Sequence, residues 1–276
     1  MAPVFRLVLE YDGAAFSGWQ VQPDRETVQG VLETAIARVA GCRVRVEGSG
    51  RTDAGVHAEG QVASAEIETD LGTERLRLAL NGVLPRSLAV VDVAIAPPDF
   101  HARRDARSKR YRYRIWNGAT RSPLRSARAW CLQRPLALSE MRRAAAALVG
   151  THDFATFQSA GSSVTTTERT LYRVDVEGAS GAAIELCFEG SGFLRHMVRN
   201  LTGTLVEVGS GRRRAEDVPG LLAARDRRQA GRTAPAHGLT LEWVRYEPEG
   251  QASTGRAGGG PAPIPGAFST ADRPVA

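Results

Sequence analysis

The sequence contains few of the residues that mark secreted, metal-binding or membrane-spanning proteins. Its three cysteines, Cys42, Cys131 and Cys187, are far apart and form no CxxC pair, which indicates neither a disulfide framework nor a zinc site. No stretch reaches the roughly 18 apolar residues that a membrane-spanning helix needs. The first residues, MAPVFRLVLEYDG, lack the charged start and apolar run of a signal peptide. We therefore expect a cytoplasmic protein.

Signals for cofactors are also missing. The five histidines show neither an HxxxH nor an HExxH spacing, which favours structural or RNA-contacting roles over metal ligation. The run GSGRTD lacks the GK[ST] ending of a P-loop and the strand–helix context of a dinucleotide-binding motif. We expect no cofactor and no metal.

Lysine is almost absent: Lys109 is the only one, and arginine supplies nearly all the positive charge. The net charge is +6 and the isoelectric point is near 9.8, which fits a polyanionic partner. Guanidinium suits phosphate binding and base stacking better than ammonium does. A GC-rich coding bias explains the ratio of arginine to lysine, but the net positive charge still favours nucleic acid.

Hydrophobic periodicity predicts a first group of elements in the order strand–helix–strand–strand–helix–strand, which is that of a ferredoxin-like (split βαβ) unit, and a second group that echoes this order with insertions. In the first group we expect strands at 4–10, 43–47, 61–68 and 88–95 and helices at 27–40 and 73–82. In the second we expect strands at 109–116, 128–133, 169–177, 183–189 and 239–246 and helices at 139–149, 193–208 and 215–223. Thr27 and Ser139 are the expected N-caps, and Gly41 and Gly150 the expected stops.

The predicted fold class is therefore α+β, with two related ferredoxin-like halves, mainly antiparallel sheets and an active-site cleft between the halves. We expect an N-terminal half at 1–100 and a C-terminal half at 101–248, joined by the proline- and charge-rich crossing at 96–107. Residues 249–276 are rich in Gly, Pro, Ser and Thr and are expected to be disordered.

The most informative run is GSGRTDAGVHAEGQ at 48–61, which holds Asp53 among four glycines, directly after Arg51 and Thr52. Glycine lets a ligand approach the main chain closely, and a nearby guanidinium favours the ionised form of an acid. An exposed carboxylate of this kind can serve as a nucleophile. The alternative interpretation is a polar turn between two strands with an incidental aspartate.

The nine residues GRTDAGVHA (50–58) resemble the catalytic motif of tRNA pseudouridine synthases of the TruA family. Further segments match the same family in the same order: LEYDGAAFSGWQ (9–20), FHAR (100–103), SKRYRYRI (108–115), GTHDFATF (150–157), FLRHMVRN (193–200) and APAHGLTL (234–241). The resemblance extends over nearly the whole chain.

This resemblance implies a homodimeric, cofactor-independent enzyme that isomerises uridine to pseudouridine at positions 38, 39 and 40 of the anticodon stem-loop of tRNA. It assigns Asp53 as the nucleophile, Tyr111 as the aromatic wall of the pocket and Arg199 as the partner of Asp53. Arg51 is implied in extruding the target base, where its guanidinium recovers part of the lost stacking. We also expect His57 to contact the substrate.

Taken alone, two of these residues have simpler explanations. Tyr111 and Tyr113 point to one face of a strand, with three arginines on the other face that suit nearby phosphate, but an ordinary amphipathic strand has the same pattern. We assign Tyr113 to packing. Arg199 falls on an apolar helical face, where a buried arginine needs a partner; at the edge of that face it would simply be solvated, as we expect for Arg195.

Two other classes of function remain as alternatives. A catalytically silent RNA-binding protein of the same fold would not need Asp53, Tyr111 and Arg199 together. A glycosylase or hydrolase needs a second acid beside Asp53, and Glu59 or Glu66 would have to fold close to it.

Overall fold

The computed structural model describes residues 2–161 and 164–246. Within these residues the strands are β1 (Val4–Tyr11), β2 (Glu47–Gly48), β3 (His57–Glu66), β4 (Leu88–Ile95), β5 (Ser108–Trp116), β6 (Trp130–Cys131), β7 (Gly150–Asp153), β8 (Glu168–Gly178), β9 (Ala183–Gly190) and β10 (Leu239–Arg245). The α-helices are α1 (Val28–Ala40), α2 (Thr73–Val83), α3 (Leu138–Ala146), α4 (Met197–Gly209) and α5 (Val218–Ala224).

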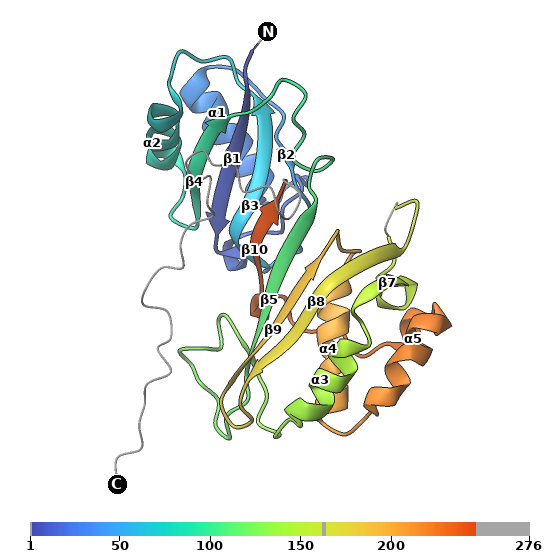
Figure 1. The fold of residues 1–276 in the computed structure, drawn as a ribbon. Coiled ribbons are helices and arrows are strands. Elements are labelled where there is room, and N and C mark those ends of the chain that lie inside the picture. Colours follow the sequence, from blue (N-terminus) through green and yellow to red (C-terminus); the bar gives the residue numbers. More distant parts are fainter. Residues whose placement is uncertain (1, 162–163, 247–276) are drawn as a thin grey trace, which may run out of the picture. The chain divides into compact units, whose positions relative to one another are not determined.

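The strands form one sheet in the order β4-β1-β3-β10-β5-β9-β8-β7, with β2 beside β3 and β6 beside β5 (Figure 1). The β10–β3 and β5–β6 pairs are parallel, whereas the other strand pairs are antiparallel. The chain is therefore α+β with a mostly antiparallel sheet, as the sequence predicts. The β3–β10 pair joins strands about 180 residues apart and aligns Thr240 with His57, which brings the start of β3 beside the start of β10.

The local signals of the first helix are confirmed. Thr27 caps α1 by accepting a hydrogen bond from the Gly30 N–H, and Gly41 ends it in the left-handed conformation with φ 73°. The strand expected at 43–47 is wrong, because β2 begins only at Glu47. Side chains of α1 bind the main chain of Val46 instead. Glu33 accepts a hydrogen bond from the Val46 N–H at 3.0 Å, and the Gln29 side chain donates one to the Val46 carbonyl at 2.9 Å.

Several expected boundaries in the second half are wrong. Ser139 lies inside α3, because the Ala137 N–H donates to the Gly209 carbonyl and so fixes the start of the helix one residue earlier than expected. Gly150 does not stop that helix; it begins β7, a strand that the periodicity did not predict. The helix expected from residue 193 begins at Met197, because His196 has φ 60° and interrupts the helical path. The strand expected at 128–133 shortens to β6.

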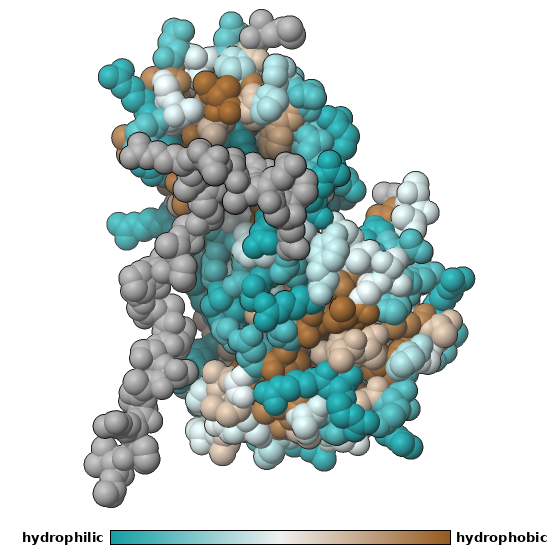
Figure 2. Space-filling model, viewed as in Figure 1, coloured by the Kyte–Doolittle hydropathy of each residue, from teal (hydrophilic) through white to brown (hydrophobic). Residues whose placement is uncertain are grey.

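One hydrophobic cluster runs through the described part of the chain, from Leu7 and Leu9 on β1 to Phe188 on β9 and Leu201 on α4. The face shown in Figure 2 is mostly hydrophilic, with hydrophobic residues gathered over the region of α3 and α5. No helix within residues 2–161 and 164–246 is long and apolar enough to cross a membrane. The tail expected to be disordered lies outside the described residues.

Candidate active site

Asp53 lies in the loop between β2 and β3, and the segment after β1 supports this loop from behind. The Trp19 N–H donates to the Thr52 carbonyl at 3.0 Å. Gly18 has φ 96°, and a Cβ at this position would lie 2.9 Å from the same carbonyl oxygen. Only glycine allows this close approach. The glycine of the SGWQ segment therefore helps to fix the main chain that carries Asp53.

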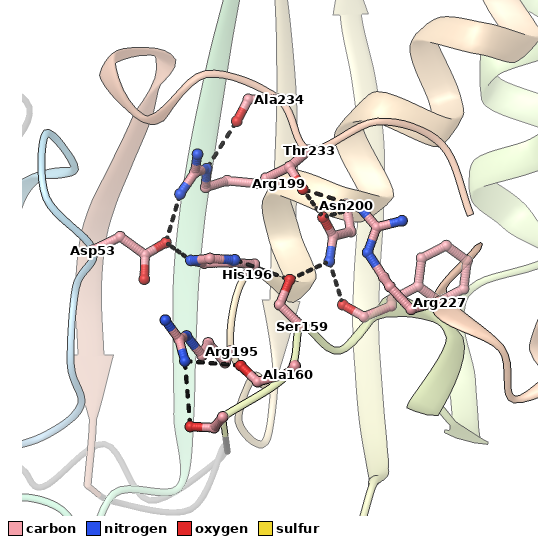
Figure 3. Close-up of polar contacts among 12 residues, drawn as sticks. Asp53, Ser159, Ala160, Arg195, His196, Arg199, Asn200, Arg227, Thr233 and Ala234 are labelled. Carbon is pink, nitrogen blue, oxygen red and sulfur yellow. Dashed lines mark hydrogen bonds and ion pairs between the residues drawn. The ribbon is translucent and has the colours of Figure 1, made fainter. Parts of the chain in front are cut away.

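Arg199 and His196 meet the carboxylate of Asp53, as Figure 3 shows. Arg199 Nη1 lies 2.9 Å from Asp53 Oδ2, and His196 Nε2 lies 3.4 Å from the same oxygen. Asp53 Oδ1 has no side-chain partner within the described residues. The carboxylate is thus held through one oxygen while the other stays open.

The surroundings of Asp53 favour its ionised form. Burial by itself raises the pKa of this carboxyl, but hydrogen bonds and electrostatic attraction from His196 and Arg199 outweigh burial and hold the pKa below its usual range. The Asp53 side chain is 30% exposed, against 16% for Arg199. An ionised, partly exposed carboxylate with a fixed orientation can act as a nucleophile.

His196 is a site residue that the sequence analysis did not identify. It precedes α4 with φ 60°, and its Nδ1 lies 2.9 Å from Ser159 Oγ. Asn200 donates to the same Ser159 oxygen at 3.4 Å and to the Phe157 carbonyl at 2.8 Å. This chain of contacts fixes the imidazole (Figure 3). Helical spacing gives no signal for this contact, because His196 lies before α4 in the left-handed conformation.

Carbonyl groups of the loop at 234–238 hold several of these side chains. Arg199 Nε donates to the Ala234 carbonyl at 2.8 Å, and the Tyr113 hydroxyl donates to the Pro235 carbonyl at 2.8 Å. The chain just before this loop can pass close to α4 because residue 203 is glycine: a Cβ there would overlap the main-chain carbonyl of Arg232. The APAHG segment is therefore a support for Arg199.

Tyr111 and Tyr113 differ in their surroundings. Tyr113 is fully buried and its hydroxyl is bound, whereas the Tyr111 hydroxyl has no hydrogen-bond partner in the described chain. The Tyr111 ring packs edge-on against Phe193, with centroids 5.1 Å apart. Burial, followed by the proximity of Tyr11 and Asp53, raises the pKa of Tyr111. Tyr111 therefore lies near Asp53 as a neutral phenol.

Arg51 and His57 lie in contrasting environments. Arg51 is exposed and makes no ion pair within residues 2–161 and 164–246. His57 is 4% exposed; the Gly13 N–H donates to its Nδ1 at 3.1 Å, and its Nε2 lies 3.2 Å from the His237 carbonyl. Burial lowers the pKa of His57 despite nearby Asp12. The role of His57 as a substrate contact stays a prediction.

The arginines on the other face of β5 are paired with acids. Arg112 lies 2.8 Å from Glu59 and 2.7 Å from Glu242. Arg110 and Arg114 pair with Glu242 and Glu185. This face is therefore an internal ion network, not the open phosphate-binding face that the sequence suggested. Glu59 takes part in this network through Arg112, and Glu66 is exposed. Neither acid therefore pairs with Asp53 as the second carboxylate that a glycosylase or hydrolase needs. No three His, Cys, Asp or Glu side chains in the described chain are grouped to hold a metal ion.

Comparisons with known proteins agree over most of the chain. The sequence profile of a family described as tRNA pseudouridine synthase matches residues 7–105 and 144–247. A protein named tRNA pseudouridine synthase A from Myxococcus xanthus is 49% identical over 244 residues, covering 88% of this chain and 92% of that protein. A protein of the same name from Geobacillus kaustophilus is 47% identical over 252 residues, covering 90% of this chain and 96% of that protein. The one from Bordetella petrii is 44% identical over 254 residues, covering 90% and 92%.

Proposed function

The chain belongs to the tRNA pseudouridine synthase family, whose members isomerise uridine in tRNA, and we propose that its targets are the uridines at positions 38, 39 and 40 of the anticodon stem-loop. The observation that carries the chemistry is the Asp53 carboxylate, which Arg199 and His196 bind through Oδ2 alone. Asp53 Oδ1 is left open toward a substrate.

In the proposed reaction Asp53 Oδ1 attacks the target nucleoside and the N1–C1′ glycosidic bond breaks. The uracil then rotates, a new bond forms between C5 and C1′, and the bond between Asp53 and the nucleoside breaks, which returns the free carboxylate. The proton leaves C5 and N1 gains one, so the reaction is an isomerisation that needs no cofactor. Binding through Oδ2 keeps the carboxylate ionised and limits its rotation, which supports a well-oriented attack.

Tyr111 is proposed to hold the loosened base and to help move the proton from C5. Its raised pKa means that the hydroxyl stays protonated at neutral pH. It can therefore serve as a hydrogen-bond donor or as a relay that gives and takes a proton together, and not as a standing base. Arg51, exposed on the same loop as Asp53, is the proposed group that takes the place of the extruded base.

The direct test is to incubate the full chain with an unmodified tRNA transcript and to map pseudouridine by mass spectrometry of nuclease fragments. We expect modification in the anticodon stem-loop at positions 38 to 40 and at no distant uridine. Modification confined to another arm of the tRNA would contradict the proposed targets, and no modification would contradict the activity.

The matching order of the strands supports two related ferredoxin-like halves, at 1–100 and 101–248. In the first half the order across the sheet is β4-β1-β3-β2. Numbered by their order in the chain, these are the fourth, first, third and second strands of that half. In the second half β10-β5-β9-β8 repeats this order when β6 and β7 are set aside as insertions. Asp53 belongs to the first half and Tyr111 and Arg199 to the second, which supports a site between the two.

A homodimer and a cytoplasmic location complete the proposal. The dimer rests on the family resemblance, and analytical ultracentrifugation of the full chain tests it. The location rests on the proposed tRNA substrate.

Tyr111→Phe is expected to retain tRNA binding but to lose about 100-fold in single-turnover pseudouridine formation, because the ring remains and only the proton-relaying hydroxyl is removed. Tyr111→Ala should lose both binding and turnover, since stacking on a base is worth about 1–3 kcal/mol. Tyr113→Phe is the matched control on the same strand; it loses the bond to the Pro235 carbonyl but should keep substantial turnover. Equal losses in the two phenylalanine variants would remove the special status of Tyr111.

His196→Asn is expected to lower turnover about tenfold with little change in melting temperature, because asparagine tolerates the left-handed conformation but cannot reach Asp53. His196 is a positioning residue, so the decisive measurement is the pH profile of single-turnover rates. Losing this partner raises the pKa of Asp53, and the acidic limb of the profile should move to higher pH. Ser159→Ala, which keeps the imidazole, should move the limb less. An unmoved limb in His196→Asn would contradict the assignment.

A further inference from the structure

Lys109 lies on β5 and makes no ion pair within residues 2–161 and 164–246. Because side chains alternate along a strand, Lys109 shares the face of Tyr111 and lies about 7 Å from it along the chain. Its Nζ donates to the carbonyl of Ser49, four residues before Asp53, at 2.5 Å. The ammonium therefore sits against the loop that carries the proposed nucleophile.

The charge of Lys109 is unmatched in the described chain. Arg110, Arg112 and Arg114 on the opposite face of the same strand all have carboxylate partners, but Lys109 has none. Two of its three N–H donors have no acceptor within residues 2–161 and 164–246. Burial and the nearby charge of Arg103 lower the pKa of Lys109 to about 8. A bound anion would stabilise the charge of this desolvated, repelled ammonium.

The identity of this residue also points to a specific fit. The chain has 36 lysines and arginines, and Lys109 is the single lysine among them. The Nζ is confined between the Ser49 carbonyl and Gly50, where even a Cβ would lie 2.9 Å from it. An ammonium is smaller than a guanidinium and carries its charge at one atom. The position thus holds a compact point charge, which is how lysine binds phosphate.

We propose that Lys109 binds a backbone phosphate of the RNA next to the target uridine, an inference that rests on the proposed action on tRNA. The two unused N–H donors would contact the phosphate while the third stays on the Ser49 carbonyl. The same ammonium would then contact both the RNA backbone and the loop that carries Asp53, and so fix one relative to the other.

The first test measures the dissociation constant of the full chain for an unmodified tRNA transcript across a series of NaCl concentrations. Lys109→Met keeps the length of the side chain and removes its charge. It should weaken binding at least about tenfold and reduce the slope of log affinity against log salt by about 0.7–1, the value of one lost phosphate contact. Arg114→Met makes the same change in net charge on the opposite face and should leave the slope unchanged. An unchanged slope in Lys109→Met would overturn the proposal.

The second test uses a set of short RNA stem-loops that each carry one neutral methylphosphonate near the target uridine. The parent protein should lose affinity at one backbone position, and Lys109→Met should lose nothing further at that position. If the methylphosphonate lowers the affinity of Lys109→Met as much as that of the parent at every position, Lys109 only supports the loop. Both tests read binding, so they remain informative if the parent fails to form pseudouridine, an outcome that would count against the proposed function alone.

The pH dependence of the affinity for tRNA gives a further test of the contact between Lys109 and phosphate. Phosphate binding holds the proton on Lys109, so the affinity of the parent should be constant below about pH 8 and fall above it, as the free amine deprotonates. Lys109→Met should not show this fall. Parallel curves for the two proteins between pH 7 and 8.8 would contradict a bound phosphate.

Discussion

Asp53→Asn is expected to abolish pseudouridine formation while the fold and the affinity for tRNA stay nearly unchanged. The amide has the size of the carboxylate, and its oxygen can still accept the hydrogen bond that Arg199 Nη1 makes at 2.9 Å. The variant loses the negative charge on Oδ1, the oxygen proposed to attack the substrate. We expect the single-turnover rate to fall by at least about 1,000-fold, or about 4 kcal/mol of transition-state stabilisation.

Glu59→Gln is the matched control for this variant. Glu59 is the acid that a two-carboxylate hydrolase would have needed, but it lies 2.8 Å from Arg112 in the ion network of the sheet. Its amide should therefore leave the rate within a few-fold of the parent. Circular dichroism and filter binding with excess protein would show whether fold and affinity survive in both variants. Turnover by Asp53→Asn within tenfold of the parent would sink the assignment of Asp53.

Much of the fold was predictable because it depends on neighbouring residues. The alternation of apolar side chains predicted β4 at 88–95 with both boundaries correct, and Thr27 and Gly41 marked the ends of α1. These signals act within one or two turns of the chain. The failed strand at 43–47 shows the limit, because Val46 satisfies its main chain with Glu33 and Gln29, side chains that no local pattern assigns to it.

The site was only partly accessible from sequence, for a similar reason. The glycine-rich loop marked Asp53, and the resemblance added Arg199, which lies 146 positions further along the chain and is joined to Asp53 only by the fold. His196 was missed because its contact depends on a left-handed residue before α4. The arginines of β5 were read as a phosphate face because their glutamate partners come from three other strands.

Arg199→Leu is expected to lower both stability and activity, because it removes the cation from a largely buried pair. A fully buried partner is worth about 3–5 kcal/mol when it is removed alone. Asp53 is 30% exposed and keeps His196, so we expect a smaller loss of unfolding free energy, about 2–3 kcal/mol. For a chain of this size that corresponds to a loss of about 4–12 °C in melting temperature. Turnover should fall about 100-fold or more, because Asp53 loses the bond that orients it.

Arg195→Leu tests whether these losses belong to the pair or to any arginine at this end of α4. Arg195 is exposed, and its Nη1 donates to the carbonyls of Ala160 and Gly161 without touching Asp53 (Figure 3). Its removal should change stability by no more than about 0.5 kcal/mol and leave turnover within a few-fold. Small, equal effects at the two positions would show that Arg199 does not support the nucleophile.

The double variant Asp53→Asn with Arg199→Leu decides how Arg199 acts. If Arg199 contributes through the carboxylate, its removal should cost clearly less stability in the Asp53→Asn background than in the parent, because the unpaired charge on Asp53 is already gone. The remaining cost would then report the bond from Arg199 Nε to the Ala234 carbonyl, which both backgrounds share. Thermal unfolding of the four proteins gives the coupling energy directly. A coupling near zero would mean that Arg199 serves the loop at 234–238 and not the charge of Asp53.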